Sequence, residues 1–306
     1  MDAQALNQLT IALDPSLQLM LAAAIVIMMF AIALGLRPEH FSFLRSDPKL
    51  FFGGLAAQLI ALPALTIALA TILQPAPSIA LGMIVVAACP GGNVSNFMTY
   101  AARGDTAYSV SLTAGSSVIA ALWTPASILL WSELYAPTAD LLETIEFNRL
   151  SFILQTTFML AAPLGLGMTT AFFRPNIAEK LRKPLARFGA AIMAFVIIRG
   201  TIDFWPILIG AWAIIMIPVI AHNAAAFALG AAAGRILSAS SPQQRSLTFE
   251  VGIQNAGLAV VLLIAQLKGM GGAAAIAAVW GVWHFFSGGA MIAFYRYLDR
   301  RKVKTQ

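Results

Sequence analysis

The sequence predicts an all-α polytopic membrane protein, because apolar residues dominate it, charged residues are scarce and the apolar residues gather in long runs. Apolar residues make up 59% of the 306-residue chain and charged residues 10%, with a mean hydropathy of +0.82. Average soluble proteins carry about 25% charged residues. This number of charged residues is too small to form a hydrated shell around a folded core. Much of the surface must therefore face lipid.

Nine apolar runs are candidate membrane-spanning helices, each of which needs about 20 residues. They cover residues 17–36, 50–73, 78–102, 106–131, 150–173, 188–204, 207–234, 246–267 and 273–295. The sixth run is the shortest and contains Arg199. No linker or soluble segment interrupts the runs, so residues 1–306 are predicted to form a single membrane domain whose chemistry lies inside the helix bundle.

The third run contains the segment Cys-Pro-Gly-Gly-Asn-Val-Ser-Asn at residues 89–96, which disfavours a continuous helix. Proline removes an N–H donor and clashes with the preceding turn, and adjacent glycines weaken a helix further. An unwound stretch near the middle of a span survives only when it is buried in protein or lines a cavity. A simple kink against a neighbouring helix is the alternative interpretation.

The eighth run contains Phe-Glu-Val-Gly-Ile-Gln-Asn-Ala-Gly at residues 249–257, with the carboxylate of Glu250 inside the span. An ionisable group at membrane depth costs about 2.5–3.5 kcal/mol on insertion scales and usually marks function. An interfacial carboxylate is the alternative. The third and eighth runs cross in opposite directions, as expected for inverted repeats whose broken helices meet near the midplane at a substrate site.

These two segments, together with Val282-Trp283-His284 in the last run, resemble the signature of the bile acid:sodium symporter family. The resemblance covers nearly the whole chain. It implies a core of spans at about 50–131 and 207–295, and a panel of spans at about 17–36 and 150–204. The two broken helices would cross in the core, and the substrate would lie in the crevice between core and panel while the panel rocks.

The resemblance also implies two sodium ions that share one carboxylate. The first ion would be held by Ser95, Asn96, Ser109, Thr113 and Glu250. The second would be held by Gln58, Glu250, Gln254 and the backbone carbonyls of Val251 and Ile253. Hard cations prefer such oxygen ligands. Without the resemblance, Ser109 and Thr113 could also be ordinary hydrogen-bonding groups between helices.

Substrate contacts implied by the resemblance are Asn93, Asn255 and His284. His284 could instead pack at a helix interface. Arg199 lies near the outer end of the sixth run, where it could attract the carboxylate of a substrate or simply extend its charged head to the membrane interface.

The expected function is sodium-coupled import of an organic anion, bile-acid-like or a small carboxylate, by alternating access and without an enzymatic reaction. The expected partners are that anion, two co-transported sodium ions and the lipid bilayer, with no nucleic acid and no obligatory protein partner. A proton-coupled or uncoupled carrier is the main alternative, because Glu250 could itself titrate. An ion channel is less favoured, because the chain has two isolated breaks in place of a filter motif or a continuous polar stripe.

The basic residues predict an outside N-terminus and a cytoplasmic C-terminus in the cell membrane. In this orientation the inner connections and the C-terminal tail hold all of the 19 basic residues except Arg149, Arg199 and Lys268. This distribution follows the positive-inside rule. Reporter domains fused to the two ends should therefore lie on opposite sides of the membrane, and finding both on one side would contradict an odd number of spans.

Overall fold

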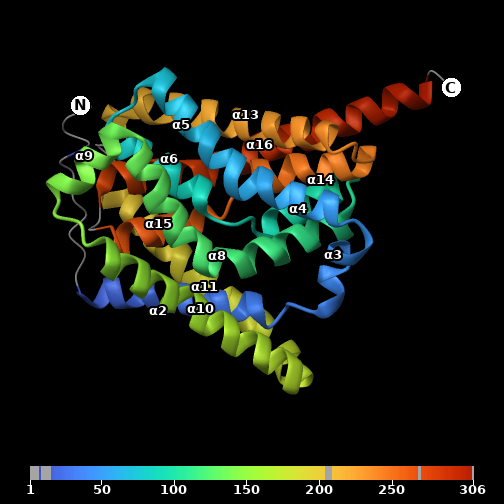
Figure 1. Cartoon of the computed structure of the whole chain (residues 1–306), viewed down its shortest axis with the longest axis horizontal. Helices are drawn as coiled ribbons and strands as arrows, with labels where there is room; N and C mark the ends of the chain where they lie inside the picture. Colours follow the sequence, from blue (N-terminus) through green and yellow to red (C-terminus); the bar gives the residue numbers. More distant parts are fainter. Residues whose placement is uncertain (1–6, 8–14, 204–208, 268–269, 305–306) are drawn as a thin grey trace.

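The computed structural model describes residues 7, 15–203, 209–267 and 270–304, and these residues form helices with no β-strand among them (Figure 1). In chain order the helices are α2 (Pro15–Ala33), η1 (Pro38–Phe41), α3 (Phe43–Ser46), α4 (Pro48–Ala56), η2 (Ala57–Ala61), α5 (Leu62–Leu73), α6 (Pro77–Ala88), α7 (Asn93–Ala101), α8 (Thr106–Leu134), α9 (Ala136–Thr144), α10 (Arg149–Phe173), α11 (Pro175–Asp203), α13 (Trp212–Ile236), α14 (Ser241–Gly252), α15 (Ala256–Ala265) and α16 (Gly271–Lys304). The all-α prediction is confirmed.

Five continuous helical stretches are long and apolar enough to cross a membrane. They are Pro48–Leu73, Thr106–Leu134, Arg149–Phe173, Trp212–Ile236 and Gly271–Arg301. A sixth span results if Leu19–Ala33 and Pro38–Ser46, which meet at 83°, are counted as one bent pair. The predicted third and eighth runs are each divided into two shorter helices, so the total of nine spans stays a prediction.

The sixth run begins earlier as a helix than its apolar residues indicate. We expected a loop before residue 188, whereas α11 starts at Pro175 and continues to Asp203. Proline is well suited to a first helical position, and the segment that follows is rich in Ala, Glu, Lys, Leu and Arg, which are strong helix formers. Basic residues assigned to the loop therefore lie on a helix.

The two predicted helix breaks lie side by side in the structure. The first separates α6 from α7, and the second separates α14 from α15. Gly91 and Gln254 pair as an isolated antiparallel bridge, and the Asn255 N–H donates to the Pro90 carbonyl at 2.9 Å. Backbone groups freed by one break are thus partly satisfied by the other, which is what burial at membrane depth requires.

The helices pack as two groups around these breaks. Helices α2, α10 and α11 lie together along the lower side of Figure 1, and α5, α13 and α16 lie along the upper side. A Cβ built on Gly167 of α10 would lie 2.8 Å from the Phe30 carbonyl oxygen of α2, so only glycine permits the observed approach of these two helices. The break region is placed between the groups.

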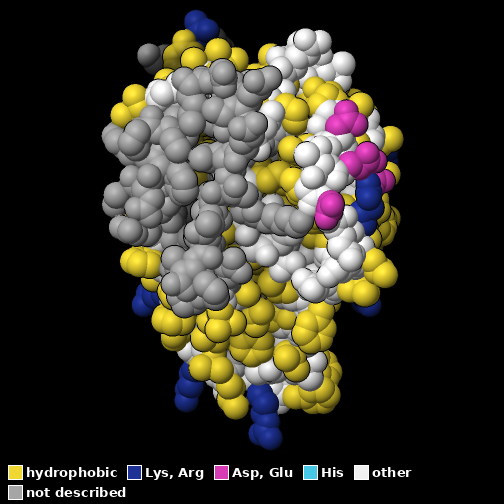
Figure 2. All heavy atoms as spheres, turned by 90° about the vertical axis from the view of Figure 1, so that its left-hand side faces the viewer, with side chains coloured by type: hydrophobic (Ala, Val, Ile, Leu, Met, Phe, Trp, Pro, Cys, Tyr) yellow, Lys and Arg dark blue, Asp and Glu magenta, His cyan; other side chains and the backbone are white. Residues whose placement is uncertain are grey.

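One end of the molecule carries an acidic surface. Figure 2 shows the end that bears α9, where acidic side chains gather at one side beside hydrophobic ones. The exposed acidic residues of α9 and its flanks are Glu133, Asp140, Glu143 and Glu146. Helix α16 runs away from this end and finishes at the opposite one (Figure 1). The predicted outer connection and the basic C-terminal helix therefore lie at opposite ends.

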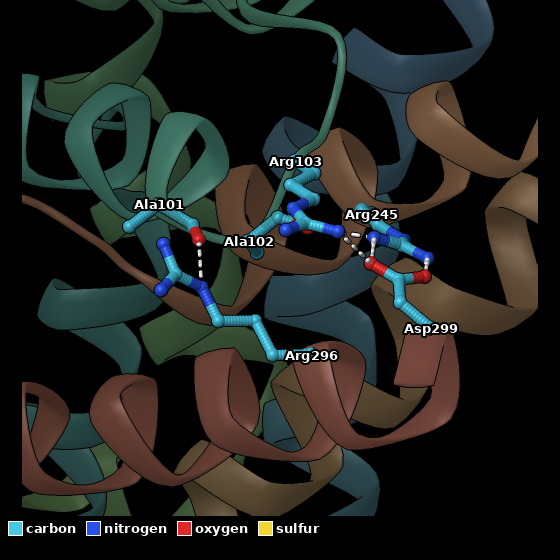
Figure 3. A network of polar contacts seen from close by, with 6 residues as sticks. All are labelled: Ala101, Ala102, Arg103, Arg245, Arg296 and Asp299. Carbon is cyan, nitrogen blue, oxygen red and sulfur yellow. Dashed lines mark hydrogen bonds and ion pairs between the residues drawn. The ribbon is translucent and has the colours of Figure 1, made fainter. Parts of the chain in front are cut away.

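Arginines join the C-terminal end of α7 and the N-terminal turns of α14 to α16 (Figure 3). Arg245 of α14 donates to the Ala102 carbonyl at 2.8 Å and forms an ion pair with Asp299 of α16 at 2.5 Å. Arg296 of α16 donates to the Ala101 carbonyl at 2.8 Å. Cationic side chains at the last carbonyls of a helix satisfy unpaired acceptors and favour the helix dipole. This network fixes α7 and α14 against α16.

We predict that Asp299→Asn destabilises the protein, because the Arg245 side chain is only 12% exposed and would lose its charged partner. Hydrogen bonds to charged groups contribute about 1.5–3 kcal/mol. The melting temperature in detergent should fall clearly. Glu133→Gln is the matched control: it removes an ion pair with Arg149 in which both side chains are 45% exposed. Such surface pairs contribute about 0–1 kcal/mol, so equal shifts in the two variants would contradict the prediction.

Candidate ion-binding site and crevice

The carboxylate of Glu250 connects three helices at the breaks. Glu250 lies in the last turn of α14 and is fully buried. Its Oε1 accepts hydrogen bonds from the hydroxyls of Ser95 and Ser109, each at 2.6 Å, and its Oε2 accepts one from the Thr113 hydroxyl at 2.9 Å. Ser95 belongs to α7, whereas Ser109 and Thr113 are one turn apart on α8. The structure thus shows that this carboxylate is enclosed by protein and hydrogen-bonded to its neighbours.

In this cluster the hydroxyl groups of Ser109 and Thr113 have fewer hydrogens to donate than there are acceptor oxygens around them. The Asn96 Oδ1 lies 2.8 Å from the Ser109 hydroxyl and 3.3 Å from that of Thr113. Each hydroxyl has one hydrogen but lies near two acceptors, the Asn96 amide oxygen and the Glu250 carboxylate. All five side chains predicted for the first ion site are therefore brought together, in a donor set that fits a hard cation.

The side chains predicted for the second ion site meet on the other side of the same glutamate. The Gln58 Nε2 donates to the Glu250 carbonyl at 2.8 Å, and the Gln254 Nε2 donates to the Val251 carbonyl at 2.9 Å. Ile253, also predicted, is buried with an extended backbone at the break. Among the described residues, the amide oxygens of both glutamines are buried without a hydrogen-bond donor. Buried acceptors in this position fit a cation that would pair with them.

Local backbone features explain how these groups converge. Gln58 lies in η2, a π-helical turn between α4 and α5. Single π-turns within α-helices often occur at functional sites. A Cβ built on Gly91 would lie 2.8 Å from the Gln58 Nε2 and 3.0 Å from the Glu250 Oε2. Glycine at this position therefore allows the first break to approach both side chains.

A cavity of about 880 Å³ adjoins the cluster and lies among α2, α8, α11, α15 and α16. Its lining includes the predicted ion ligands Asn96, Thr113 and Gln254, and the predicted substrate contacts Asn255 and His284. The Asn255 side chain caps α15 by accepting from the Leu258 N–H at 3.0 Å. His284 is 5% exposed, and its ring nitrogens have no hydrogen-bond partner among the described residues. The cavity is of a size typical for small-molecule sites, about 300–1,000 Å³.

Three polar residues in the cavity wall, Arg182, His40 and Ser117, were not predicted as site residues. Arg182 of α11 and His40 of η1 both line it. A Cβ built on Gly35, just after α2, would lie 2.8 Å from the Arg182 Nε, which places this side chain against the end of α2. Arg182 is the only Lys or Arg among the described residues lining the cavity. No local pattern predicts this position of Arg182, because it depends on the extension of α11 beyond the apolar run.

The structure does not describe the side chains of the other two residues predicted to contact a substrate. The side chains of Asn93, in the first turn of α7, and of Arg199, in α11, lie outside the described residues. Their proposed contacts with a substrate stay predictions.

Comparison with known proteins places this arrangement in a family. The model of the sodium bile acid symporter family matches residues 22–205, more than half of the chain. The chain is 30% identical to a sodium-dependent transporter of Bacillus subtilis, YocS, over 92% of its own length and 83% of that protein. It is 30% identical to the probable sodium/metabolite cotransporter BASS1 of Arabidopsis thaliana over 71% of its length and 52% of that protein. The ileal sodium/bile acid cotransporter of Homo sapiens is 27% identical over 60% and 51% of the two chains. The chain belongs to the sodium bile acid symporter family.

Proposed function

We propose that the protein is a sodium-coupled symporter that imports an organic anion by alternating access. The observation that carries the proposal is the buried Glu250 carboxylate, which joins α14 to α7 and α8 at two adjacent helix breaks and lies beside the cavity. Family membership and the sodium-dependent relatives support sodium as the coupling ion.

Two sodium ions are proposed, one on each side of Glu250. The first would be held by the hydroxyl and amide oxygens of α7 and α8, and the second by Gln58, Gln254 and backbone carbonyls near Val251 and Ile253. One carboxylate neutralises only one of two monovalent cations. The remaining positive charge favours a nearby anion, because Coulomb interactions are strong where little water screens them.

The substrate is proposed to be a bile-acid-like anion or a small carboxylate. Asn255 and His284 offer polar contacts near the ion sites, and Arg182 offers a permanent charge in the cavity wall. Arginine binds carboxylate and sulfonate groups through several donors in a fixed plane. A bound anion would therefore contact α15 and α16 on one side and α11 on the other.

Helices α2, α10 and α11 are proposed to form the panel, and the remaining spans to form the core. This grouping is supported by the packing of those three helices on one another. Because the ion ligands lie on core helices and Arg182 lies on α11, a substrate that contacts both would link ion binding to their relative position. Rigid-body movement about a fixed site is a common basis of alternating access. The N-terminus is proposed to be outside and the C-terminus cytoplasmic.

Sodium titration of uptake tests this function. Proteoliposomes are placed in a solution that contains a panel of bile acids and short carboxylates. An inward sodium gradient should then drive uptake of at least one of these anions. An inside-negative potential should increase it, because a net positive charge gains about 2.3 kcal/mol per 100 mV. Glu250→Ala should abolish this uptake and also the thermal stabilisation by sodium, and Glu250→Gln should weaken sodium affinity severely because it keeps an oxygen but loses the charge.

Glu143→Ala is the control, because Glu143 is an exposed carboxylate on α9. It should behave like the wild type. Wild-type sodium dependence in Glu250→Ala would show that the shared-carboxylate assignment is wrong. Uptake driven by a proton gradient and indifferent to sodium would favour the proton-coupled alternative.

Arg182→Gln should raise the KM for the transported anion about tenfold or more, since a charge-assisted contact of about 1.5–3 kcal/mol is lost. Sodium-induced stabilisation without substrate should stay unchanged, because Arg182 lies on α11 and is not one of the proposed ion ligands. Arg187→Gln is the matched control on the same helix, where the side chain is exposed and does not line the cavity. An unchanged KM in Arg182→Gln would remove this residue from the substrate site.

A further inference from the structure

A second, larger groove lies on the surface of the molecule, between α13, α14 and α16. Its volume is about 1270 Å³. Trp283 and Phe286 of α16 line it, whereas the neighbouring His284 and Phe285 line the crevice described above. Helix α16 therefore separates the two cavities, and this surface groove is no part of the proposed substrate site.

The groove is apolar along most of its length. Small residues of α13, namely Ala224, Ala228 and Ala231, leave space opposite the aromatic side chains Phe286 and Phe294 of α16. Both phenylalanines are more than half exposed, at 68% and 52%. Side chains of this kind, on helices long enough to span a membrane, provide a surface that fits a hydrocarbon chain.

The other end of the groove is basic. Arg235, Arg245 and Arg301 line it, and no acidic side chain is found among its described lining residues. Arg245 is already bound to Asp299. Arg235 is exposed and makes no ion pair with any described residue, and Arg301 extends over the ring of Tyr297 at 5.4 Å. Arg235 and Arg301 are both exposed and line this end of the groove, where their positive charges would attract an anionic group.

The length of the groove matches one leaflet of a bilayer. Ile220 and Arg235 mark its two ends on α13, and fifteen residues of helix span about 22 Å. One leaflet contributes about 15 Å of hydrocarbon, which leaves room for a headgroup at the arginines. The basic end is also the end that we expect to face the cytoplasm, where the leaflet surface carries anionic lipid.

We propose that this groove binds an anionic phospholipid, with an acyl chain along α13 and α16 and the phosphate at Arg235 and Arg301. Basic pockets between helices on the cytoplasmic side are a recognised form of lipid headgroup site. A second copy of the chain fits less well. Two copies facing each other across this groove in one membrane would bring their arginines together, and like charges at an interface disfavour association.

Lipid binding to the purified protein in detergent tests the proposal. Dioleoyl phosphatidylglycerol should raise the melting temperature more than dioleoyl phosphatidylcholine, and native mass spectrometry should show preferential retention of the anionic lipid. The double variant Arg235→Gln, Arg301→Gln should lower the apparent affinity for phosphatidylglycerol roughly 25-fold, about fivefold for each arginine. Ala228→Trp should also reduce binding by filling the apolar part of the groove while all charges are kept.

The matched control is Arg174→Gln, Lys180→Gln, which removes two exposed basic side chains that do not line the groove. It should retain the wild-type preference for phosphatidylglycerol. Equal binding of the two lipids by the wild type would overturn the proposal, as would an unchanged preference in the double arginine variant. Dimerisation that Ala228→Trp abolishes, with no lipid preference, would assign the groove to a second copy instead.

Discussion

The structure depends on how the buried carboxylate of Glu250 is satisfied. An ionised carboxylate away from water is strongly disfavoured unless it is paired or hydrogen-bonded. Here three hydroxyl groups from α7 and α8 donate to it, and none of them lies on its own helix. One side chain therefore holds α7, α8 and α14 together at the breaks, beside the crevice.

The two helix breaks make this arrangement possible. A continuous helix in the third run would leave no free backbone at the level of Glu250, and the hydroxyl of Ser95 would be placed elsewhere. The breaks satisfy each other through the bridge between Gly91 and Gln254 and the bond from Asn255 to Pro90. Away from the break, Arg245 and Arg296 cap the carbonyls at the C-terminal end of α7 (Figure 3). Each irregular segment is thus compensated by a neighbour, as burial in a membrane protein requires.

The features that could be predicted from the sequence are those that depend on a residue's own effect on the backbone or on its cost of burial. The Pro90-Gly91-Gly92 break and the buried Glu250 are strong signals, because few residues have such definite effects on a helix or such a cost at membrane depth. The π-turn at Gln58 has no comparable signal, since ordinary helix-forming residues surround it. Arg182 was read as part of a loop, because its place in the cavity depends on the packing of α11 against α2, which no local pattern specifies.

The residue types around Glu250 suit the proposed cation site, which would exist both with and without its ion. An ion-free carrier that reorients would leave the carboxylate at membrane depth with no counter-charge. Serine and threonine hydroxyls can rotate, so the same oxygen donates its hydrogen to Glu250 in one state and presents a lone pair to a cation in the other. Lysine or arginine at Ser109 or Thr113 would neutralise the carboxylate permanently and exclude the ion. Small hydroxyl groups would therefore allow the proposed ions to bind reversibly, because the carboxylate would be hydrogen-bonded before the ions arrive and after they leave.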